Sequence, residues 1–287
     1  MVIIDGKQIS AALKEQLREQ VATFPQQYGR VPHLVVVRVG EDPASVVYVR
    51  NKAKACEVCG IRNTTIVLPE DTSEEALLQR IRALNANPEV DGLLVQLPLP
   101  PHISEAKVIE TIDRSKDVDG FHPLNVAGLW QKTPHMNPCT PAGIMKLLAA
   151  AGVDPKGKRA VVIGRSNIVG LPVAKMLLDA NATVTLCHTR TVDLPSVTRE
   201  ADILVVAAGR AKMVSADMVK DGAVVIDVGM DRDPETGKLC GDVDFDAVAP
   251  KTKAITPVPG GVGPMTIACL MENTVKCFLE KLKPAGL

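Results

Sequence analysis

The chain has 287 residues, of which 46% are hydrophobic and 23% are charged. It is long enough for two domains with sizeable cores, and this composition excludes a disordered or fibrous protein. Its 33 Lys and Arg residues balance 33 Asp and Glu residues, so no net field favours nucleic acid or an anionic membrane as a partner. Aromatic residues make up only 2%, which predicts an aliphatic core of the kind found in parallel α/β sheets.

Seven cysteines are scattered along the chain, and Cys56 and Cys59 form a Cys-x-x-Cys pair. No second pair or histidine follows at zinc spacing, so we interpret these cysteines as buried structural thiols and expect no metal. The N-terminus lacks a basic segment followed by a long apolar one, and no apolar run approaches the roughly 18 residues of a membrane span. We therefore expect a protein of the reducing cytoplasm with no membrane partner.

Helical and strand patterns alternate in the first part of the chain. Periodicity predicts helices over 5–24, 43–59 and 73–85, and strands over 33–39, 61–68 and 90–97. Asp42 is expected to cap the second helix and Gly60 to end it. The alternation predicts a mostly parallel sheet.

Residues 116–140 are dense in Gly, Pro, His and Asp with little periodicity, which indicates a long binding loop. A helix over 141–151 is expected to lead into a second domain with a βαβαβ pattern typical of dinucleotide binding. The predicted strands cover 159–163, 183–186, 203–207 and 223–228, and the predicted helices cover 171–180, 194–200 and 216–219. A terminal helix is predicted over 266–282.

The clearest local signal is the turn between the first strand and first helix of this second domain. Gly164 follows the strand and Gly170 opens the helix, which favours close backbone approach to a phosphate at a helix N-terminus. The turn departs from G-x-G-x-x-G, because Ser166 replaces the second glycine and Gly170 comes one residue late. An ordinary strand-to-helix turn is the alternative, but the βαβαβ pattern favours a cofactor. The expected cofactor contacts are Gly164, Arg165, Ser166, Ile168 and Val169, with Ala208 and Gly209 after the third strand.

Cofactor choice is read at the end of the next strand, where NAD-selective sites place an acid. No acid follows that strand until Asp193. Arg165, His188 and Arg190 can instead surround a 2′-phosphate, with Thr189 donating a hydrogen bond. NADP is therefore preferred, the alternative being that these are solvated loop residues.

Tyr48 and Lys52 stand at i and i+4 of a predicted helix, so both side chains project from one face. A Lys ammonium can donate a proton, or act as a base once burial and positive neighbours lower its pKa. The same Tyr-x-x-x-Lys spacing occurs in short-chain dehydrogenases. There the pair follows the glycine loop, whereas here it precedes Gly164 by more than 100 residues, which argues against that family.

Three further features each have two interpretations. Gln96 ends an apolar strand, where it either lines a ligand crevice or caps a turn. Asp117 and Asp119 either cap turns or bind the paired N–H donors of an aminopyrimidine ring. The segment 257–264 is too rich in Gly and Pro for regular structure, and either approaches a flat ligand or forms a tight turn.

Taken together, these segments resemble the bifunctional methylenetetrahydrofolate dehydrogenase/cyclohydrolase family, called FolD in bacteria. The resemblance covers nearly the whole chain through six motifs in order. The motifs are Tyr48-Val49-x-x-Lys52, Asp91-Gly92-Leu93-Leu94-Val95-Gln96-Leu97-Pro98-Leu99-Pro100, Lys116-Asp117-Val118-Asp119-Gly120, Pro138-Cys139-Thr140-Pro141, Gly164-Arg165-Ser166-x-Ile168-Val169-Gly170-x-Pro172 and Pro257-Val258-Pro259-Gly260-Gly261-Val262-Gly263-Pro264.

The resemblance implies a role for each matching residue. Lys52 would carry the proton transfers of the hydrolytic step, and Gln96 would orient it. Tyr48 would lean on the aminobenzoyl ring of the folate, and Asp119 would bind the pterin. The remaining implied substrate contacts are Leu97, Pro259, Gly260 and Gly261, the last three closing over the folate.

The implied fold is α/β with two domains and a cleft between them: a catalytic domain over 1–140 plus 266–287, and a Rossmann-type NADP-binding domain over 141–265. The implied reactions are NADP-dependent oxidation of 5,10-methylenetetrahydrofolate and hydrolysis of the methenyl product to 10-formyltetrahydrofolate, in one-carbon metabolism that serves purine and amino-acid biosynthesis. The resemblance also implies a homodimer joined through the second domain. A dehydrogenase without useful cyclohydrolase activity, a catalytically silent sensor and a generic amino-acid or hydroxy-acid dehydrogenase are the rivals, in decreasing order of support.

Overall fold

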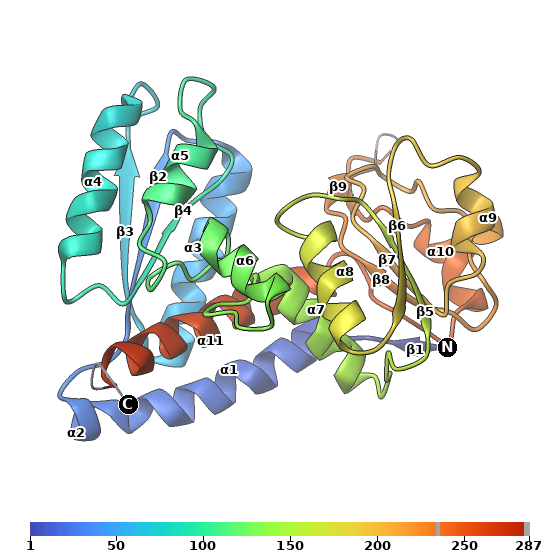
Figure 1. Ribbon diagram of the computed structural model, residues 1–287, viewed down its shortest axis with the longest axis horizontal. Helices are drawn as coiled ribbons and strands as arrows, with labels where there is room; N and C mark the ends of the chain where they lie inside the picture. Colours follow the sequence, from blue (N-terminus) through green and yellow to red (C-terminus); the bar gives the residue numbers. More distant parts are fainter. Residues whose placement is uncertain (234–235, 284–287) are drawn as a thin grey trace. The chain divides into compact units, whose positions relative to one another are not determined.

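A computed structural model of the protein describes residues 1–233 and 236–283. The chain forms two compact units (Figure 1). The N-terminal unit comprises residues 11–139 and the chain from Ile267 onward, and the C-terminal unit comprises residues 1–10 and 140–266.

The first ten residues differ from the sequence-based domain assignment, which places them in the first domain. Strand β1 (Val2–Ile3) instead pairs in parallel with β11 (Ala254–Ile255) of the C-terminal unit. A strand of two residues is too short to show a periodicity, so the sequence pattern does not reveal this pairing.

The N-terminal unit is built on a parallel sheet in the order β3-β2-β4. Its strands are β2 (His33–Val39), β3 (Arg62–Leu68) and β4 (Gly92–Val95). All three predicted strands are present, although β4 is shorter than the apolar run that predicted it. One face packs against α4 (Glu74–Ala86) and α5 (Glu105–Thr111) in a core of Val, Leu and Ile side chains.

Helix α3 (Pro43–Cys59) lies across the sheet from α4 (Figure 1) and has the bounds predicted from the sequence. The Asp42 carboxylate caps it by accepting a hydrogen bond from Ser45 N at 2.8 Å. Gly60 ends it in the left-handed conformation, with φ 69°. The stripe buried against the sheet contains Lys52, which is 8% exposed. A lysine buried this deeply is uncommon unless it is paired or functional.

Several short helices were not predicted. Helix α6 (Pro123–Trp130) lies inside the stretch expected to be an irregular binding loop, so that expectation was wrong in part. Its start is fixed by Pro123 at the first position and by the His122 ring, which accepts a hydrogen bond from Leu124 N at 3.1 Å. The remaining N-terminal helices are α1 (Gly6–Ala22) and α2 (Phe24–Tyr28), and α1 runs from the C-terminal unit into the N-terminal one.

The C-terminal unit has a six-stranded parallel sheet in the order β1-β11-β8-β7-β5-β6. Its four longer strands are β5 (Arg159–Ile163), β6 (Thr183–Cys187), β7 (Ile203–Val206) and β8 (Val224–Asp227). Since β6 lies on one side of β5 and β7 on the other, the chain reverses direction across the sheet at β5. Such a switch point is where doubly wound sheets bind their ligands.

The helices around this sheet follow the predicted βαβαβ pattern closely. They are α7 (Cys139–Ala150), α8 (Gly170–Asp179), α9 (Leu194–Thr198) and the single 3-10 turn η1 (Ala216–Met218), where a helix was predicted. The short elements β9 (Asp231–Arg232), β10 (Leu239–Cys240), α10 (Phe245–Val248) and η2 (Ala249–Lys251) were not predicted. Alternate residues of β5, β7 and β8 form one aliphatic core with the helices on that face.

The terminal helix α11 (Val262–Lys281) begins inside the Gly- and Pro-rich segment that was expected to lack regular structure. Its later part packs on the N-terminal unit, as predicted. Asn273 Nδ2 donates to Val118 O at 2.8 Å, and Cys56 Sγ contacts Met271 Sδ at 3.6 Å. No helix in the described part of the chain is both long and apolar enough to cross a membrane.

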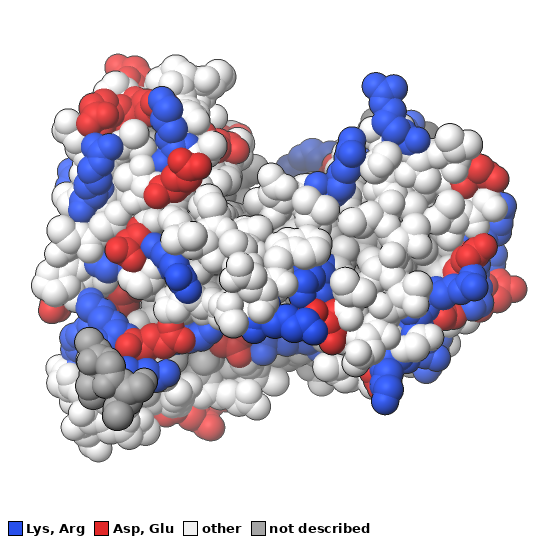
Figure 2. Space-filling model, in the orientation of Figure 1, with Lys and Arg blue, Asp and Glu red and all other residues white. Residues whose placement is uncertain are grey.

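The cysteines are free thiols, and all but Cys240 are buried. Burial raises the pKa of Cys56 to about 12 and that of Cys59 to about 11, so both stay protonated and unreactive. This environment agrees with a structural role. On the face shown in Figure 2, acidic and basic side chains are intermixed and no field of one sign covers either unit.

Candidate active site

The carboxyl end of β4 carries the first group of predicted site residues. Gln96 follows the strand, and its backbone N–H donates to Val37 O at 2.8 Å. Its side chain does two things: Nε2 donates to Leu97 O at 2.6 Å, and Oε1 accepts from Lys52 Nζ at 3.0 Å. Because the amide nitrogen is occupied by Leu97, the amide oxygen is directed at the ammonium. The turn-capping interpretation therefore describes the amide nitrogen of Gln96, whereas its place in a ligand crevice stays a prediction.

Lys52 reaches Gln96 from α3, one helical turn after Tyr48. Tyr48 is half-buried, and burial raises the pKa of its hydroxyl, which therefore stays protonated at neutral pH. The structure thus places Tyr48, Lys52 and Gln96 in one unit, with a direct contact between the last two.

The Lys116-to-Gly120 motif contains residues that stabilise the local structure and one residue, Asp119, that remains a candidate for substrate binding. Lys116 is 7% exposed and donates from Nζ to the carbonyl oxygens of Leu84, Asn85 and Asn87 at 3.1, 2.7 and 2.7 Å. These carbonyls end α4, where a cation compensates the helix dipole. Lys116 is therefore a helix cap.

Asp117 is likewise structural. Its carboxylate accepts hydrogen bonds from the backbone N–H groups of Gly120, Phe121 and His122 and from Asn125 Nδ2 at 2.7 Å. The turn needs glycine at 120, where φ is 76° and a Cβ would lie 2.7 Å from backbone atoms of residues 137 and 138. Of the two interpretations offered for the aspartates, turn capping holds for Asp117.

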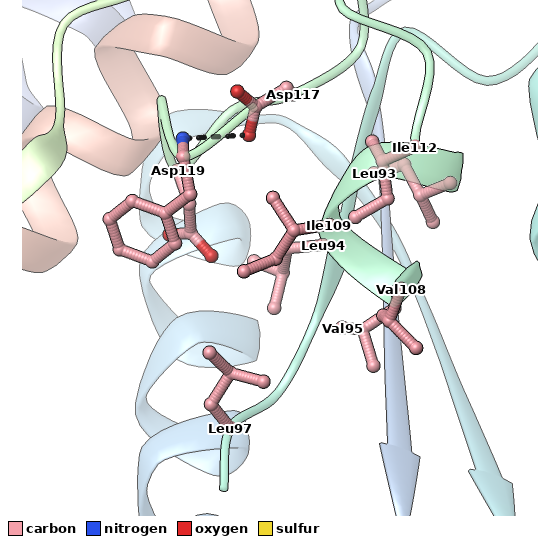
Figure 3. Close-up of a pocket in the computed structure, with 10 residues that line it drawn as sticks. Leu93, Leu94, Val95, Leu97, Val108, Ile109, Ile112, Asp117 and Asp119 are labelled. Carbon is pink, nitrogen blue, oxygen red and sulfur yellow. Dashed lines mark hydrogen bonds between the residues drawn. The ribbon is translucent and has the colours of Figure 1, made fainter. Parts of the chain in front are cut away.

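Asp119 lies two residues further on, in the wall of a small pocket that Figure 3 shows. Burial raises the pKa of its carboxyl, the Lys52 ammonium acts in the opposite direction, and Asp117 adds a smaller upward effect. Asp119 and Lys52 are thus within electrostatic reach of each other. The pocket is otherwise mainly apolar and is lined by Leu93, Leu94, Val95, Leu97, Val108, Ile109, Ile112, Asp117, Asp119 and Phe121.

The predicted substrate contacts Pro259, Gly260 and Gly261 belong to the C-terminal unit. There the start of α1 holds them: Lys7 N donates to Gly260 O at 3.1 Å, and a Cβ on Gly6 would lie 1.8 Å from Gly261 O. Residues 258–260 form a turn, so the tight turn that was the alternative interpretation is present.

The second group of site residues surrounds the switch point of the C-terminal sheet. Gly164 has φ 115°, and a Cβ there would lie 2.2 Å from Ala207 O. A Cβ on Gly170 would lie 2.1 Å from Gly164 O, so both glycines are required by close backbone approach. Ser166 stands where the usual motif has its second glycine, and its Oγ accepts from Val169 N at 3.2 Å and Gly170 N at 3.3 Å. It caps the first turn of α8.

A tight turn follows β6, where cofactor choice was predicted. Thr191 Oγ1 accepts from His188 N at 2.9 Å, and the His188 ring accepts from Arg190 N at 3.1 Å. The side chains of Arg165, Thr189 and Arg190 are exposed. Asp193, the first acid after the strand, accepts from Ser196 N at 3.3 Å and caps α9. The Asp193 carboxylate is therefore used to cap a helix rather than to bind a ribose hydroxyl.

The loop after β7 contains Ala208 and Gly209 and lies beside the Gly164 turn, since Ala207 N donates to Ile163 O at 2.8 Å. Two buried aspartates that sequence reasoning missed, Asp227 and Asp242, hold this region. Their only sequence signal is a nearby glycine: Asp242 directly follows Gly241, and Asp227 stands two positions before Gly229. No group of three or more His, Cys, Asp or Glu side chains within the described ranges is placed to hold a metal ion.

These observations define a two-unit α/β protein, with a Lys–Gln pair in one unit and a doubly wound parallel sheet with a glycine turn at its switch point in the other. Residues 138–282 match the family model described as tetrahydrofolate dehydrogenase/cyclohydrolase, NAD(P)-binding domain. Residues 4–119 match the catalytic domain of the same family. The chain belongs to the tetrahydrofolate dehydrogenase/cyclohydrolase family.

Individual relatives agree over almost the full length. The bifunctional protein FolD of Streptococcus pneumoniae is 58% identical over 280 residues, which cover 98% of each chain. The crystal structure of the bifunctional FolD of Campylobacter jejuni has a TM-score of 0.95 at 51% identity and covers 98% of this chain and 100% of its own. A Trypanosoma brucei FolD, solved with NADP and an inhibitor, has a TM-score of 0.94 at 41% identity, with 99% of both chains covered.

The comparisons confirm the family predicted from the six motifs, the two-part α/β fold and the assignment as an enzyme of the dehydrogenase/cyclohydrolase type. The roles of individual residues stay predictions.

Proposed function

We propose that this chain oxidises 5,10-methylenetetrahydrofolate with NADP and hydrolyses the resulting 5,10-methenyltetrahydrofolate to 10-formyltetrahydrofolate. The observation that carries the hydrolytic half is the buried Lys52 ammonium held by Gln96 Oε1 at 3.0 Å. Family membership and the bifunctional relatives support both halves.

The C-terminal unit is suited to NADP. Gly164 and Gly170 let the backbone of the strand-to-helix turn pack closely, and Ser166 accepts hydrogen bonds at the start of α8, where a helix N-terminus can bind a phosphate. Exposed Arg165 and Arg190 provide charge for a 2′-phosphate. When bound, NADP supplies the acceptor for the hydride that leaves the methylene carbon. The adjacent folate nitrogen assists that departure with its lone pair, so the protein mainly contributes proximity and orientation.

Hydrolysis requires proton transfer by a residue of the N-terminal unit. Water adds to the methenyl carbon, a proton is transferred at Lys52 Nζ, and one carbon–nitrogen bond then breaks to leave the formyl group on N10. Gln96 keeps Nζ in place because its own amide nitrogen is bonded to Leu97 O. Lys52 and Gln96 thus act together.

Substrate recognition is assigned to the residues that flank this pair. The Asp119 carboxylate would bind the paired N–H donors of the pterin through its two oxygens, and the Tyr48 ring would contact the aminobenzoyl group. Leu97 contributes apolar wall. The remaining proposed folate contacts are Pro259, Gly260 and Gly261.

A two-signal absorbance assay tests the proposal. Protein is mixed with methylenetetrahydrofolate and NADP, and reduced nicotinamide and methenyl absorbance are followed together. Reduced nicotinamide without lasting methenyl species is expected, and added methenyltetrahydrofolate should be consumed without cofactor. Reduced nicotinamide with stable methenyltetrahydrofolate would indicate a dehydrogenase alone. No signal with NADP or NAD would overturn the proposal.

Cofactor preference gives a separate prediction. Arg190→Gln is expected to lower kcat/KM for NADP about tenfold or more and to leave kcat/KM for NAD unchanged, because a charge-assisted hydrogen bond contributes about 1.5–3 kcal/mol. Steady-state rates with both cofactors measure this. Lys156→Gln removes an exposed charge before β5, at the opposite end of the strand from the crevice, and serves as control. Equal loss with both cofactors would contradict the assignment.

We also propose a cytoplasmic homodimer joined through the C-terminal unit. Support comes from β6, which is an edge strand of that sheet with an exposed Leu186. An edge strand presents unpaired backbone groups to a second chain. Light scattering of the purified protein should give the mass of two chains, and the mass of one would contradict this part of the proposal.

A further inference from the structure

The loop that follows β7 is held by one buried carboxylate. Asp242 is fully buried, and its Oδ2 accepts from Ala208 N at 2.6 Å and Gly209 N at 3.2 Å, while its Oδ1 accepts from Arg210 N at 2.7 Å. Three consecutive backbone N–H groups therefore converge on one side chain from 32 or more residues away along the chain. This convergence fixes the direction of the loop.

A second buried carboxylate holds the first in place. Asp227, the last residue of β8, accepts at Oδ1 from Asp242 N at 3.0 Å and at Oδ2 from Val243 N at 2.9 Å. Two glycines make room for these groups: a Cβ on Gly241 would lie 1.9 Å from Asp227 Oδ2, and one on Gly229 would lie 2.4 Å from Asp242 N. The hydrogen bonds of Asp227 and Asp242 therefore form a relay from the end of β8 to the loop after β7.

This relay ends at the switch point of the sheet. Strands β7 and β8 are neighbours, with Val206 opposite Asp227, and the residue after β7 contacts the Gly164 turn. Burying two carboxyl groups is costly, and the backbone N–H donors offset that cost only in part, since burial still raises the pKa of Asp227 to about 7. In a parallel sheet the loops at this end form the wall of the ligand crevice. The cost is thus incurred where the shape of a binding loop matters.

We propose that Asp242 is a positioning residue for the cofactor: it holds the Ala208–Arg210 backbone in the shape against which NADP lies. The inference rests on the proposed NADP-dependent function. Asp242 does not contact the cofactor, because its side chain is buried and both oxygens are used by the loop.

Asparagine is the informative substitution. Asp242→Asn preserves size, but it replaces one accepting oxygen with an NH2 group that faces N–H donors. The loop then loses at least one of its three hydrogen bonds and must shift away from the new amide. We expect the Kd and KM for NADP to rise at least tenfold. The N-terminal unit, which carries Lys52 and Gln96, is not involved in the relay.

The two activities separate this effect from general damage, since hydrolysis of added methenyltetrahydrofolate needs no NADP. Calorimetric titration with NADP and the hydrolysis rate are measured for wild type and for Asp242→Asn. A tenfold weaker NADP affinity with hydrolysis within twofold of wild type supports the inference. Unchanged NADP affinity, or an equal loss of both activities, overturns it. Asp202→Asn is the matched control, because Asp202 also accepts a backbone N–H in this unit but lies before β7, at the other end of that strand.

A variant that does not fold is replaced by Asp242→Glu, which keeps the charge but displaces it by one methylene. Weaker NADP binding by the glutamate variant supports positioning, and wild-type binding overturns it. Wild-type protein serves as the test of the parent proposal. If wild type itself fails to bind NADP, the proposed function is wrong, whereas if wild type binds and both variants bind equally well, only the role of Asp242 is wrong.

Discussion

Lys52→Met is expected to abolish cyclohydrolase activity, by about 10²–10⁴-fold, and to leave a measurable fraction of the dehydrogenase activity. Methionine preserves the length and apolar stem of lysine but cannot donate or accept the proton that water addition requires. Hydride transfer needs only a correctly placed substrate and cofactor. The variant therefore places the substrate less accurately but can still carry out this step. Hydrolysis of methenyltetrahydrofolate and NADP reduction, measured separately on one preparation, give the two rates.

Lys54→Met is the matched control, since Lys54 is exposed on the same helix. It should leave both rates near those of wild type. Equal loss of both activities in Lys52→Met, or full retention of both, would contradict the division of labour between the two chemical steps. Gln96 offers an independent check, because its replacement by Leu removes the oxygen that holds Nζ and should lower hydrolysis more than oxidation.

Long elements could be predicted from the sequence because their signals are local. The bounds of α3 follow from Asp42 and Gly60, whose capping roles depend only on nearby backbone. Strands β2 and β5 are buried apolar runs that agree with their predicted ranges. Pairing partners are not local. The pairing of β1 with β11 joins residues that are about 250 positions apart, and no pattern in either segment indicates it.

The candidate site shows the same limit. The Lys52–Gln96 contact was expected only because the family resemblance implied that Gln96 orients Lys52. Without the resemblance, the functions of Asp117 and Asp119 could not be separated, because both are acids in one glycine-bounded turn. Asp242 was missed for a related reason: its partners are backbone N–H groups, which are present at every non-proline residue and leave no mark in the sequence.

Asp117→Asn and Asp119→Asn are expected to have opposite effects on stability and function. Asp117 accepts four hydrogen bonds, three of them from the backbone of its turn, and the Asn variant turns an accepting oxygen into a donor that faces other donors. We expect it to lose about 3 kcal/mol of the free energy of unfolding. Asp119→Asn should be at least as stable as wild type at neutral pH but should lose folate binding.

The sign of the Asp119 effect follows from its environment. Burial raises the pKa of Asp119, so the folded state holds the carboxyl proton more tightly than the unfolded state does. Ionisation of Asp119 therefore lowers the free energy of unfolding as the pH rises above the usual aspartate pKa of about 3.9. Removing the charge relieves that cost. As the pH is lowered, the Asp119 carboxylate takes up its proton at a higher pH than an ordinary aspartate does. Folate affinity of the wild type should therefore begin to fall at that higher pH. The Asn variant should lack this acidic limb.

Thermal unfolding and folate titration between pH 4 and 8 measure both properties in each variant. Asp117→Asn should unfold several degrees lower, since about 1 kcal/mol corresponds to 2–4 °C in a domain of 150–250 residues. A destabilised Asp119→Asn, or one that binds folate normally, would mean that Asp119 is a second turn cap. The pterin contact would then have to come from another residue of the pocket, and Asp117 is excluded because its oxygens are already bonded to the turn.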